Sequence, residues 1–246
     1  MRAFLLAAGL GTRLKPLTDS VPKCLMPIHG KTLLEIWVAL LERGGIEHAL
    51  INTHHLAHQV ETAVRDLDRR YRLHLDTVGE PQLLGSAGTL AANAGFIPQG
   101  EDFVVAYADN LTDLALQPVS AFHKERPINT VLTMALFRTK HPEACGIAAM
   151  DEARRITDFV EKPDRPKGNL ANAGLYIASY DFLSICKELE KDLAEGPFDL
   201  GHHVLPHLVG RMAGYPMDSY LRDIGTVEAY HLALAEWPLR ERMNHV

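Results

Sequence analysis

Two glycines and three cations stand close together near the start of the chain. Gly9 and Gly11 follow an apolar run, and Arg13, Lys15 and Lys23 lie shortly after them. Glycine has no Cβ, so the backbone here can turn sharply and present its N–H groups to an anion. Arginine binds phosphate oxygens in pairs, and lysine supplies a more mobile point charge. These residue types at this spacing predict a site for several phosphate groups.

Two later stretches place charged side chains where they could reach a ligand. Asp109 ends a second apolar run, and the end of a buried strand is where open α/β sheets hold ligands. Asp113 is a rival carboxylate, but it lies further on, where a solvated loop is expected. Glu161 and Lys162 are adjacent, so on a strand they would point to opposite faces. A bend helped by Pro163 could bring both toward one pocket.

Other motifs based on glycine or histidine fit less well. A dinucleotide fingerprint needs a third glycine where Leu14 stands, and Pro16 disfavours an immediate helix. The run Gly30-Lys31-Thr32 resembles the end of a P-loop, but Leu25 stands where that motif begins with glycine. Thr32 is instead expected to cap the next helix. The histidines at 54, 55, 58, 202, 203 and 207 lack the partners of a zinc site.

The elements that must position these residues follow from hydrophobic periodicity. Residues 1–8 predict a buried strand, and residues 32–43 predict an amphipathic helix that ends at Gly44-Gly45. Further strands are expected at 48–52, 71–78, 102–108, 130–137, 146–151, 155–160 and 172–178, with a late hairpin at 212–217 and 219–221. Further helices are expected at 56–69, 86–94, 180–190, 200–209 and 226–236. The alternation in the first half predicts a mostly parallel sheet covered on both faces.

Composition sets broad limits on the class of protein. The 246 residues are 47% hydrophobic, which suffices for a full core, and the net charge of −6 argues against nucleic acid as a partner. Three scattered cysteines do not form a disulfide framework or a metal knuckle. We expect no membrane span and no cleavable signal, and therefore a soluble, cytoplasmic protein. A homo-oligomer is compatible with this composition, although no pattern indicates one.

The whole run at 9–18, Gly-x-Gly-Thr-Arg-Leu-x-Pro-Leu-Thr, followed by Pro22-Lys23, resembles the signature of the sugar nucleotidyltransferases. These enzymes join a nucleoside triphosphate to a sugar 1-phosphate. The run is most similar to the mannose-1-phosphate guanylyltransferases and related hexose- and heptose-1-phosphate enzymes. Cys24 stands where the family usually has a second proline. Four further stretches match in order, so the resemblance covers roughly residues 2–235.

Those four stretches imply roles for further residues. The run 85–88, Gly-Ser-Ala-Gly, resembles the turn under the nucleoside, and Asp109 matches the magnesium-binding aspartate, although Tyr107-Ala108 before it is unusual. The run 159–163 and Asn172 also match the family. There the resemblance implies that the glutamate and the asparagine bind hydroxyl groups of the sugar and that the lysine contacts the sugar phosphate. These sugar-phosphate-binding roles fall on Gly146, Glu161, Lys162 and Asn172. The run 221–226 resembles the family's Trp-x-Asp-Ile-Gly, which makes Asp223 the second magnesium carboxylate.

The resemblance implies a Rossmann-like three-layer α/β/α fold with a mostly parallel central sheet, a small β-rich sugar-binding part and no β-helix extension. A single nucleotidyltransferase domain is expected over residues 1–246. Residues 1–115 would mainly bind the nucleotide, and residues 116–246 the sugar phosphate. The implied reaction is an in-line attack of the sugar 1-phosphate on the α-phosphorus, with release of pyrophosphate. Mg²⁺ would be held by Asp109 and Asp223. Such nucleotide sugars supply cell-surface polysaccharide synthesis.

The resemblance also assigns catalytic roles and the nucleotide site. Arg13 is expected to bind the leaving pyrophosphate, Lys23 the α-phosphate and Lys162 the sugar phosphate. The nucleotide-binding residues expected are Leu6, Ala7, Ala8, Gly9, Gly11, Thr12, Arg13, Lys23, Glu80, Gly85 and Asp109. A carboxylate at Glu80 can accept from two N–H groups of guanine, which favours GTP. A uridylyltransferase acting on a hexose or amino-sugar 1-phosphate and a non-catalytic, sugar-nucleotide-binding regulatory homologue are the alternatives.

Overall fold

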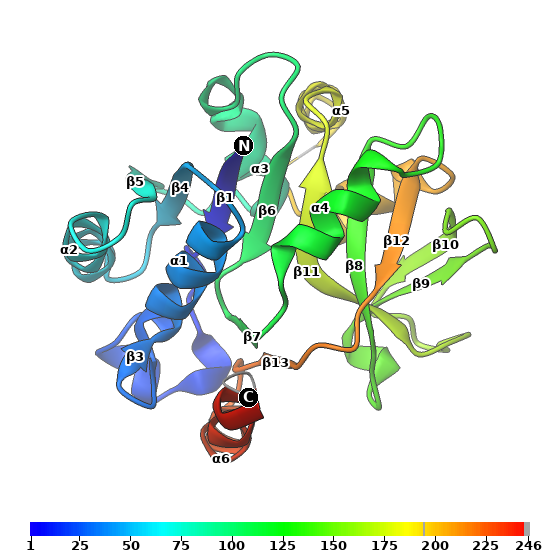
Figure 1. Cartoon of the computed structure of the whole chain (residues 1–246). Helices are drawn as coiled ribbons and strands as arrows, with labels where there is room; N and C mark the ends of the chain where they lie inside the picture. Colours follow the sequence, from blue (N-terminus) through cyan, green and yellow to red (C-terminus); the bar gives the residue numbers. More distant parts are fainter. Residues whose placement is uncertain (194, 244–246) are drawn as a thin grey trace. The chain divides into compact units, whose positions relative to one another are not determined.

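The computed structural model describes residues 1–193 and 195–243. The chain folds into two compact units, each assembled from segments that are separate in the sequence. Unit 1 comprises Met1–Arg2, Leu83–Ala106 and Gln117–Asp218, and unit 2 comprises Ala3–Gln82, Tyr107–Leu116 and Ser219–Val246. Figure 1 shows their helices and strands. The division of one domain into a nucleotide part and a sugar part stays a prediction.

Unit 2 contains a sheet with the strand order β1-β4-β5 and two short two-stranded ladders. The sheet strands are β1 (Arg2–Leu6), β4 (His48–Thr53) and β5 (His74–Gly79), and β4 and β5 pair in parallel. The ladders join β2 (Pro27–Ile28) to β3 (Lys31–Thr32), and β7 (Asn110–Thr112) to β13 (Leu221–Asp223). Its helices are α1 (Leu33–Arg43), α2 (Ala57–Asp68), α6 (Val227–Met243) and 3-10 turns at Thr12–Leu14, Leu17–Asp19 and Lys23–Leu25.

Local sequence explains why these elements form where they do. Phe4 and Leu5 of β1 are fully buried, as are Leu33 and Leu41 of α1, so strand and helix each contribute apolar side chains to the buried core. The helix begins after Thr32, whose Oγ1 accepts from the backbone N–H of Glu35 at 3.1 Å. The expected cap is therefore confirmed. It satisfies one of the donors that a helix N-terminus leaves unpaired.

Unit 1 contains a sheet of order β10-β9-β11-β6, with β8 pairing β11 and β12 pairing β8. Strand β12 runs parallel to β8, whereas β11 is antiparallel to β6, β8 and β9. The strands are β6 (Phe103–Tyr107), β8 (Leu132–Arg138), β9 (Gly146–Met150), β10 (Ile156–Glu161), β11 (Leu170–Ala178) and β12 (Met212–Pro216). The α-helices are α3 (Ser86–Ala92), α4 (Leu116–Lys124) and α5 (Asp181–Glu190); 3-10 turns lie at Ala94–Phe96, Pro142–Ala144 and Leu205–Leu208, and a π-helical turn at Leu200–Val204.

Two expectations about the second half were wrong. Residues 212–221 do not form a hairpin, because β12 pairs with β8 and β13 pairs with β7. Met212 and Ala213 are consecutive and both buried, so β12 is covered on both of its faces. The helix expected at 200–209 is a π-helical turn followed by a 3-10 turn. Pro206 within it cannot donate an α-helical hydrogen bond.

Candidate active site

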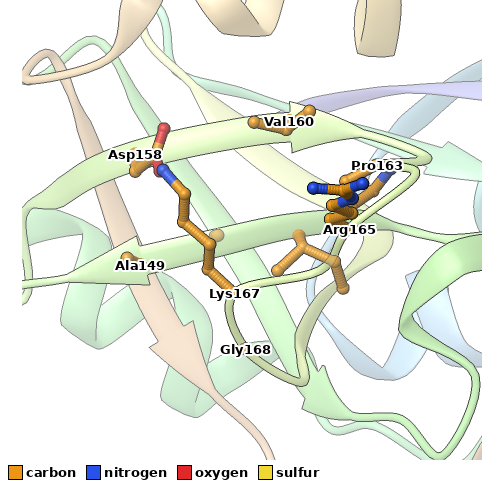
Figure 2. A pocket seen from close by; sticks show the side chains of 9 residues that line it. Ala149, Asp158, Val160, Pro163, Arg165, Lys167 and Gly168 are labelled. Atoms are coloured by element: carbon orange, nitrogen blue, oxygen red, sulfur yellow. The ribbon is translucent and has the colours of Figure 1, made fainter.

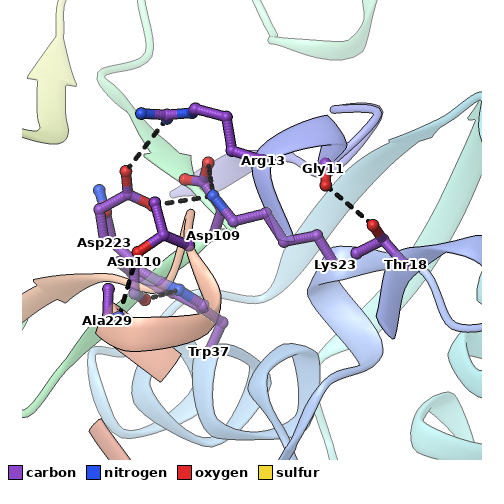
Figure 3. Close-up of polar contacts among 10 residues, drawn as sticks. Gly11, Arg13, Thr18, Lys23, Trp37, Asp109, Asn110, Asp223 and Ala229 are labelled. Carbon is purple, nitrogen blue, oxygen red and sulfur yellow. Dashed lines mark hydrogen bonds and ion pairs between the residues drawn. The ribbon is translucent and has the colours of Figure 1, made fainter. Parts of the chain in front are cut away.

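One lysine and two aspartates of unit 2 converge on a shared point. Lys23 Nζ donates to Asp109 Oδ2 and to Asp223 Oδ1, each at 2.8 Å (Figure 3). Arg13 lies beside them, with its Nη2 3.7 Å from Asp223 Oδ2. We call these four residues the Lys23 cluster. The cluster brings together four expected site residues from three separate stretches of the sequence.

Strand pairing explains how the two carboxylates meet. Asp109 lies in the turn that joins β6 to β7, and β13 pairs antiparallel with β7 so that Asp223 stands opposite Asn110. The backbone N–H of Ile224 donates to the carbonyl of Asp109 at 3.3 Å. Trp37 of α1 donates its indole N–H to the carbonyl of Asn110 at 2.7 Å, which fixes β7 against the helix.

Burial and charge act on Lys23 in opposite directions. Its side chain is only 8% exposed, whereas the side chains of Asp109 and Asp223 are 41% and 50% exposed. Burial lowers the pKa of Lys23, but the charges and hydrogen bonds of the two aspartates outweigh it, so the pKa is raised above its ordinary value. The two aspartates therefore favour the ammonium form of Lys23.

The loop after β1 contains two glycines: the fold requires Gly11, whereas Gly9 borders open space. Gly11 has φ near +63°, and a Cβ there would lie 2.8 Å from Cγ2 of Thr18. Thr18 Oγ1 also donates to the carbonyl of Gly11 at 2.8 Å. A Cβ at Gly9 would meet nothing within 4 Å. The side chain of Arg13 is 71% exposed, so its guanidinium can reach a ligand.

A small hollow gathers several of the expected nucleotide-binding residues. It is lined by Leu6, Ala7, Gly9, Lys23, Cys24 and Asp109, all within unit 2. Ala8 is buried and Thr12 is exposed in the 3-10 turn that follows Gly11. The hollow therefore joins the end of β1 to the Lys23 cluster.

Gly225 lies beside the Lys23 cluster, and the motif alone did not show why a glycine stands there. A Cβ at this position would lie 2.8 Å from Asp223 Oδ2 and 3.1 Å from Nη2 of Arg13. Both distances are tighter than ordinary contact. The glycine therefore leaves room for the Asp223 carboxylate to face both cations.

Glu80 is held by a partner that sequence patterns did not reveal. Asn52, at the end of β4, donates its side-chain N–H to Glu80 Oε1 at 2.9 Å. The carbonyl oxygen of the same amide accepts from the backbone N–H of Ala7 at 2.6 Å. Glu80 is 4% exposed and Asn52 is 5% exposed. Asn52 thus ties the carboxylate expected to contact the base to the loop expected to hold the phosphates.

The donor set of the Lys23 cluster fits magnesium. Asp109 and Asp223 supply hard oxygen donors, and both already direct an oxygen at one cationic group. Magnesium is commonly held by one or two carboxylates together with substrate phosphates. Among the described residues, no group of three or more histidine, cysteine, aspartate or glutamate side chains is arranged to hold a metal ion. Phosphate oxygens would have to complete the coordination.

Glu161 lies in a slot between two glycines of unit 1. On the β9–β10 ladder Glu161 stands opposite Gly146, where a Cβ would lie 2.5 Å from Glu161 Oε2. A Cβ at Gly201, in the π-helical turn, would lie 2.7 Å from the same oxygen. Lys162 has φ near 47°, and its Nζ lies 3.7 Å from Glu161 Oε1. The bend after Glu161 turns the two side chains toward each other.

The pKa of Glu161 is raised above its ordinary value. Burial is the main cause, and the neighbouring charge of Asp199 adds to it, while Lys162 and His202 act in the opposite direction. Asp199 is itself fixed, because its Oδ2 accepts from Ser86 Oγ at 2.8 Å. Gly201 and Asp199 were not expected from sequence, since the residues around them lack a recognisable motif.

The remaining expected residues of unit 1 have local partners. Asn172 Nδ2 donates to the hydroxyl of Tyr176 at 2.6 Å, and Asn172 Oδ1 accepts from the backbone of Gly174 at 3.0 Å. Gly85 has φ near +82°, and a Cβ there would lie 2.5 Å from the carbonyl oxygen of Phe198. The need for glycine at 85 thus comes from close packing against the Phe198 backbone. Its contact with a nucleoside stays a prediction.

A hollow of about 170 Å³ lies against the β9–β10 ladder (Figure 2). Its floor includes Val160, which is 45% exposed, and Arg165 and Lys167 lie at its margin. None of the residues that line it is an expected site residue. The lining of this hollow includes neither Glu161 nor the two glycines of its slot.

Comparison with known proteins decides the family. The family profile described as "Nucleotidyl transferase" matches residues 2–237. The chain belongs to the nucleotidyl transferase family. The resemblance stated from the motifs is therefore confirmed.

The relatives that resemble this chain are named as enzymes of different nucleotides. A UTP–glucose-1-phosphate uridylyltransferase of Synechocystis sp. is 31% identical over 99% of this chain and 65% of its own. The catalytic subunit beta of a Xenopus tropicalis mannose-1-phosphate guanylyltransferase is 31% identical over 100% of this chain and 67% of its own. The chain spans about two thirds of the length of these relatives.

Solved structures support the fold. A structure described as a candidate glucose-1-phosphate thymidylyltransferase of Bacillus anthracis, in complex with sucrose, superposes with a TM-score of 0.85. It is 23% identical, and the match covers 96% of this chain and 94% of that chain. The expected mixed α/β nucleotidyltransferase fold with a central, mostly parallel sheet is confirmed. No helix among the described residues is long and apolar enough to cross a membrane.

Proposed function

We propose that this chain is a magnesium-dependent sugar-1-phosphate nucleotidyltransferase. The observation that carries the proposal is the Lys23 cluster, in which two carboxylates and a buried ammonium converge beside an exposed arginine. Such a set suits a triphosphate and its metal, because it offers both cations for phosphate oxygens and oxygen ligands for Mg²⁺.

The proposed chemistry needs positioning and charge more than proton transfer. The oxygen of a sugar 1-phosphate is already an anion, so it can attack the α-phosphorus without a general base. Lys23 would neutralise charge at the α-phosphate, and the exposed Arg13 would hold the leaving pyrophosphate. Asp109 and Asp223 would hold Mg²⁺, which supplies Lewis-acid charge to phosphate oxygens when bound.

The sugar 1-phosphate is assigned to residues of unit 1. Glu161, between Gly146 and Gly201, would accept hydrogen bonds from sugar hydroxyls. Lys162 is 59% exposed at its side chain and would bind the sugar phosphate. Asn172 would contact a further hydroxyl once its present partners rearrange. A mannose-like hexose is the proposed sugar.

GTP is the proposed nucleotide. Asn52 holds Glu80 Oε1 at 2.9 Å, and an oriented carboxylate can accept from both N1–H and the exocyclic amine of guanine. The relative named as a guanylyltransferase agrees with this choice. UTP is the second candidate, favoured by the equally identical relative named as a uridylyltransferase. A cytoplasmic location accords with these substrates.

A pyrophosphate-release assay tests the proposal. GTP, UTP, dTTP, CTP and ATP are each paired with a panel of sugar 1-phosphates, with magnesium and after its removal by a chelator. We expect release that requires magnesium and is fastest with GTP, and loss of that release in Asp223→Ala. Turnover with no pair would overturn the enzyme assignment in favour of a sugar-nucleotide-binding regulator. Faster turnover with UTP would reject only the role given to Glu80.

A further inference from the structure

Lys23 holds the two aspartates of its cluster together from a buried position. Its Nζ lies 2.8 Å from an oxygen of each, and its side chain is 8% exposed. Both aspartates are five to six times more exposed than Lys23 is, at 41% and 50% of their side chains. The ammonium therefore reaches the carboxylates from the protein side and leaves their other faces toward solvent.

A cation at this point offsets a strong repulsion. Two carboxylates that share a position destabilise each other unless positive charge lies between them. Among the described residues, Lys23 is the cation within ion-pair distance of both Asp109 and Asp223. Arg13 reaches only Asp223, at 3.7 Å, and is largely exposed. In this arrangement Arg13 pairs with Asp223 and not with Asp109.

We infer that Lys23 is a built-in substitute for the divalent cation. In the free protein its ammonium keeps Asp109 and Asp223 side by side and competes with Mg²⁺ for them. A bound triphosphate then draws the ammonium to its own oxygens and releases the carboxylates to the metal. This inference rests on the proposed function, which assigns both aspartates to Mg²⁺ and Lys23 to the α-phosphate.

The competition has a thermodynamic consequence. If the nucleotide removes Lys23 from the carboxylates, nucleotide and metal bind cooperatively, and the coupling is equal in both directions. The free protein then binds Mg²⁺ weakly although its ligands are already in place. Removing only the ammonium charge should strengthen Mg²⁺ binding in the absence of nucleotide.

Calorimetry with Mg²⁺ alone tests this on the full chain. Lys23→Met keeps an unbranched side chain but removes the charge, and Lys31→Met is the control, because Lys31 is exposed and forms no ion pair with the described residues. We expect Lys23→Met to bind Mg²⁺ at least about tenfold more tightly than wild type, and Lys31→Met to match wild type. Lys23→Arg, which keeps the cation, should also bind weakly.

Thermal unfolding gives a second readout. Without metal, Lys23→Met should unfold at a lower temperature than wild type, and Mg²⁺ should restore most of the difference. Equal Mg²⁺ affinity of Lys23→Met and wild type would overturn the inference.

A measurement on wild type does not depend on any variant folding. The ¹⁵N resonance of the Lys23 ammonium should shift when Mg²⁺ saturates the protein, and a resonance unmoved at saturation would refute the competition. These assays need no turnover. Absence of turnover in the pyrophosphate assay would defeat the proposed function while leaving the competition measurable.

Discussion

Gly201→Ala tests whether the slot around Glu161 serves sugar binding. The new Cβ would lie 2.7 Å from Glu161 Oε2 and 2.9 Å from its Cδ. Ordinary contact begins at 3.4 Å, so the carboxylate must move by about 0.7 Å. On the β9 side the carboxylate already fills the space that a side chain at Gly146 would take, since a Cβ built there would lie 2.5 Å from the same oxygen.

The expected loss of catalytic efficiency follows from the size of that displacement. Misplacing a binding group by about 1 Å can cost roughly a hundredfold in rate, so we expect kcat/KM for the sugar 1-phosphate to fall roughly 10- to 100-fold. This equals about 1.4 to 2.7 kcal/mol of transition-state binding. The KM for the nucleoside triphosphate should stay unchanged. The free energy of unfolding should change by less than about 1 kcal/mol, because alanine also restricts the unfolded chain.

Steady-state kinetics with each substrate varied in turn measures the effect. Gly168→Ala is the matched control, since its Cβ would meet nothing within 4 Å, and it should behave as wild type. In an enzyme that already carries Glu161→Gln, adding Gly201→Ala should cost much less than it does alone. A folded Gly201→Ala enzyme with wild-type KM and kcat for the sugar 1-phosphate would refute the slot as a sugar site.

Four further predictions concern Glu161, Glu80 and Thr32. The pKa of Glu161 is raised, so the KM for the sugar 1-phosphate should rise as the pH falls through a pKa higher than that of an ordinary glutamate. Glu161→Gln should remove this rise in KM. The same rise in both enzymes would contradict the prediction. The same raised pKa means that Glu161 stabilises the fold when the pH is below the pKa that it has in the unfolded chain. This contribution is lost as the pH rises through the pKa that it has in the folded chain. In thermal melts at neutral pH, Glu161→Gln should therefore be no less stable than wild type. Glu80→Gln should lower the preference for GTP over UTP by roughly tenfold or more in competition assays, and an unchanged ratio would exclude Glu80 from base contact. Thr32→Ala should lower the free energy of unfolding by about 1 kcal/mol in urea titration with kinetics unchanged, and no loss of stability would show that the cap at Glu35 contributes little.

Local patterns were sufficient for much of the fold. The buried strand at residues 2–6 and helix α1 were predictable because each has its own hydrophobic period, and Thr32 marks the helix start. The hairpin error at 212–221 has the opposite origin. Two short strands that follow each other need not pair, and here each pairs with a strand far away in the sequence. Partner choice depends on tertiary packing, which no local window contains.

The candidate site divides in the same way. Asp109, Asp223 and Lys23 were identified by type and motif, yet the shared contact at 2.8 Å depends on the β7–β13 ladder and could not be derived from their spacing. Asn52 and Gly201 were missed because neither lies in a recognisable motif. Asn52 acts through one amide that joins Ala7 to Glu80, and Gly201 acts by lacking a side chain.

The reaction proposed for this chain is transfer of a nucleotidyl group to a sugar 1-phosphate. It can be followed with a nucleoside triphosphate labelled at its α-phosphorus, by separating the products after incubation with the sugar phosphate and magnesium. We predict that the label moves into a nucleotide sugar in an amount equal to the pyrophosphate released, and that Lys23→Met loses most of this transfer. Label that stays in the triphosphate, or appears only in a nucleoside mono- or diphosphate, would show that the chain does not transfer a nucleotidyl group to the sugar phosphate.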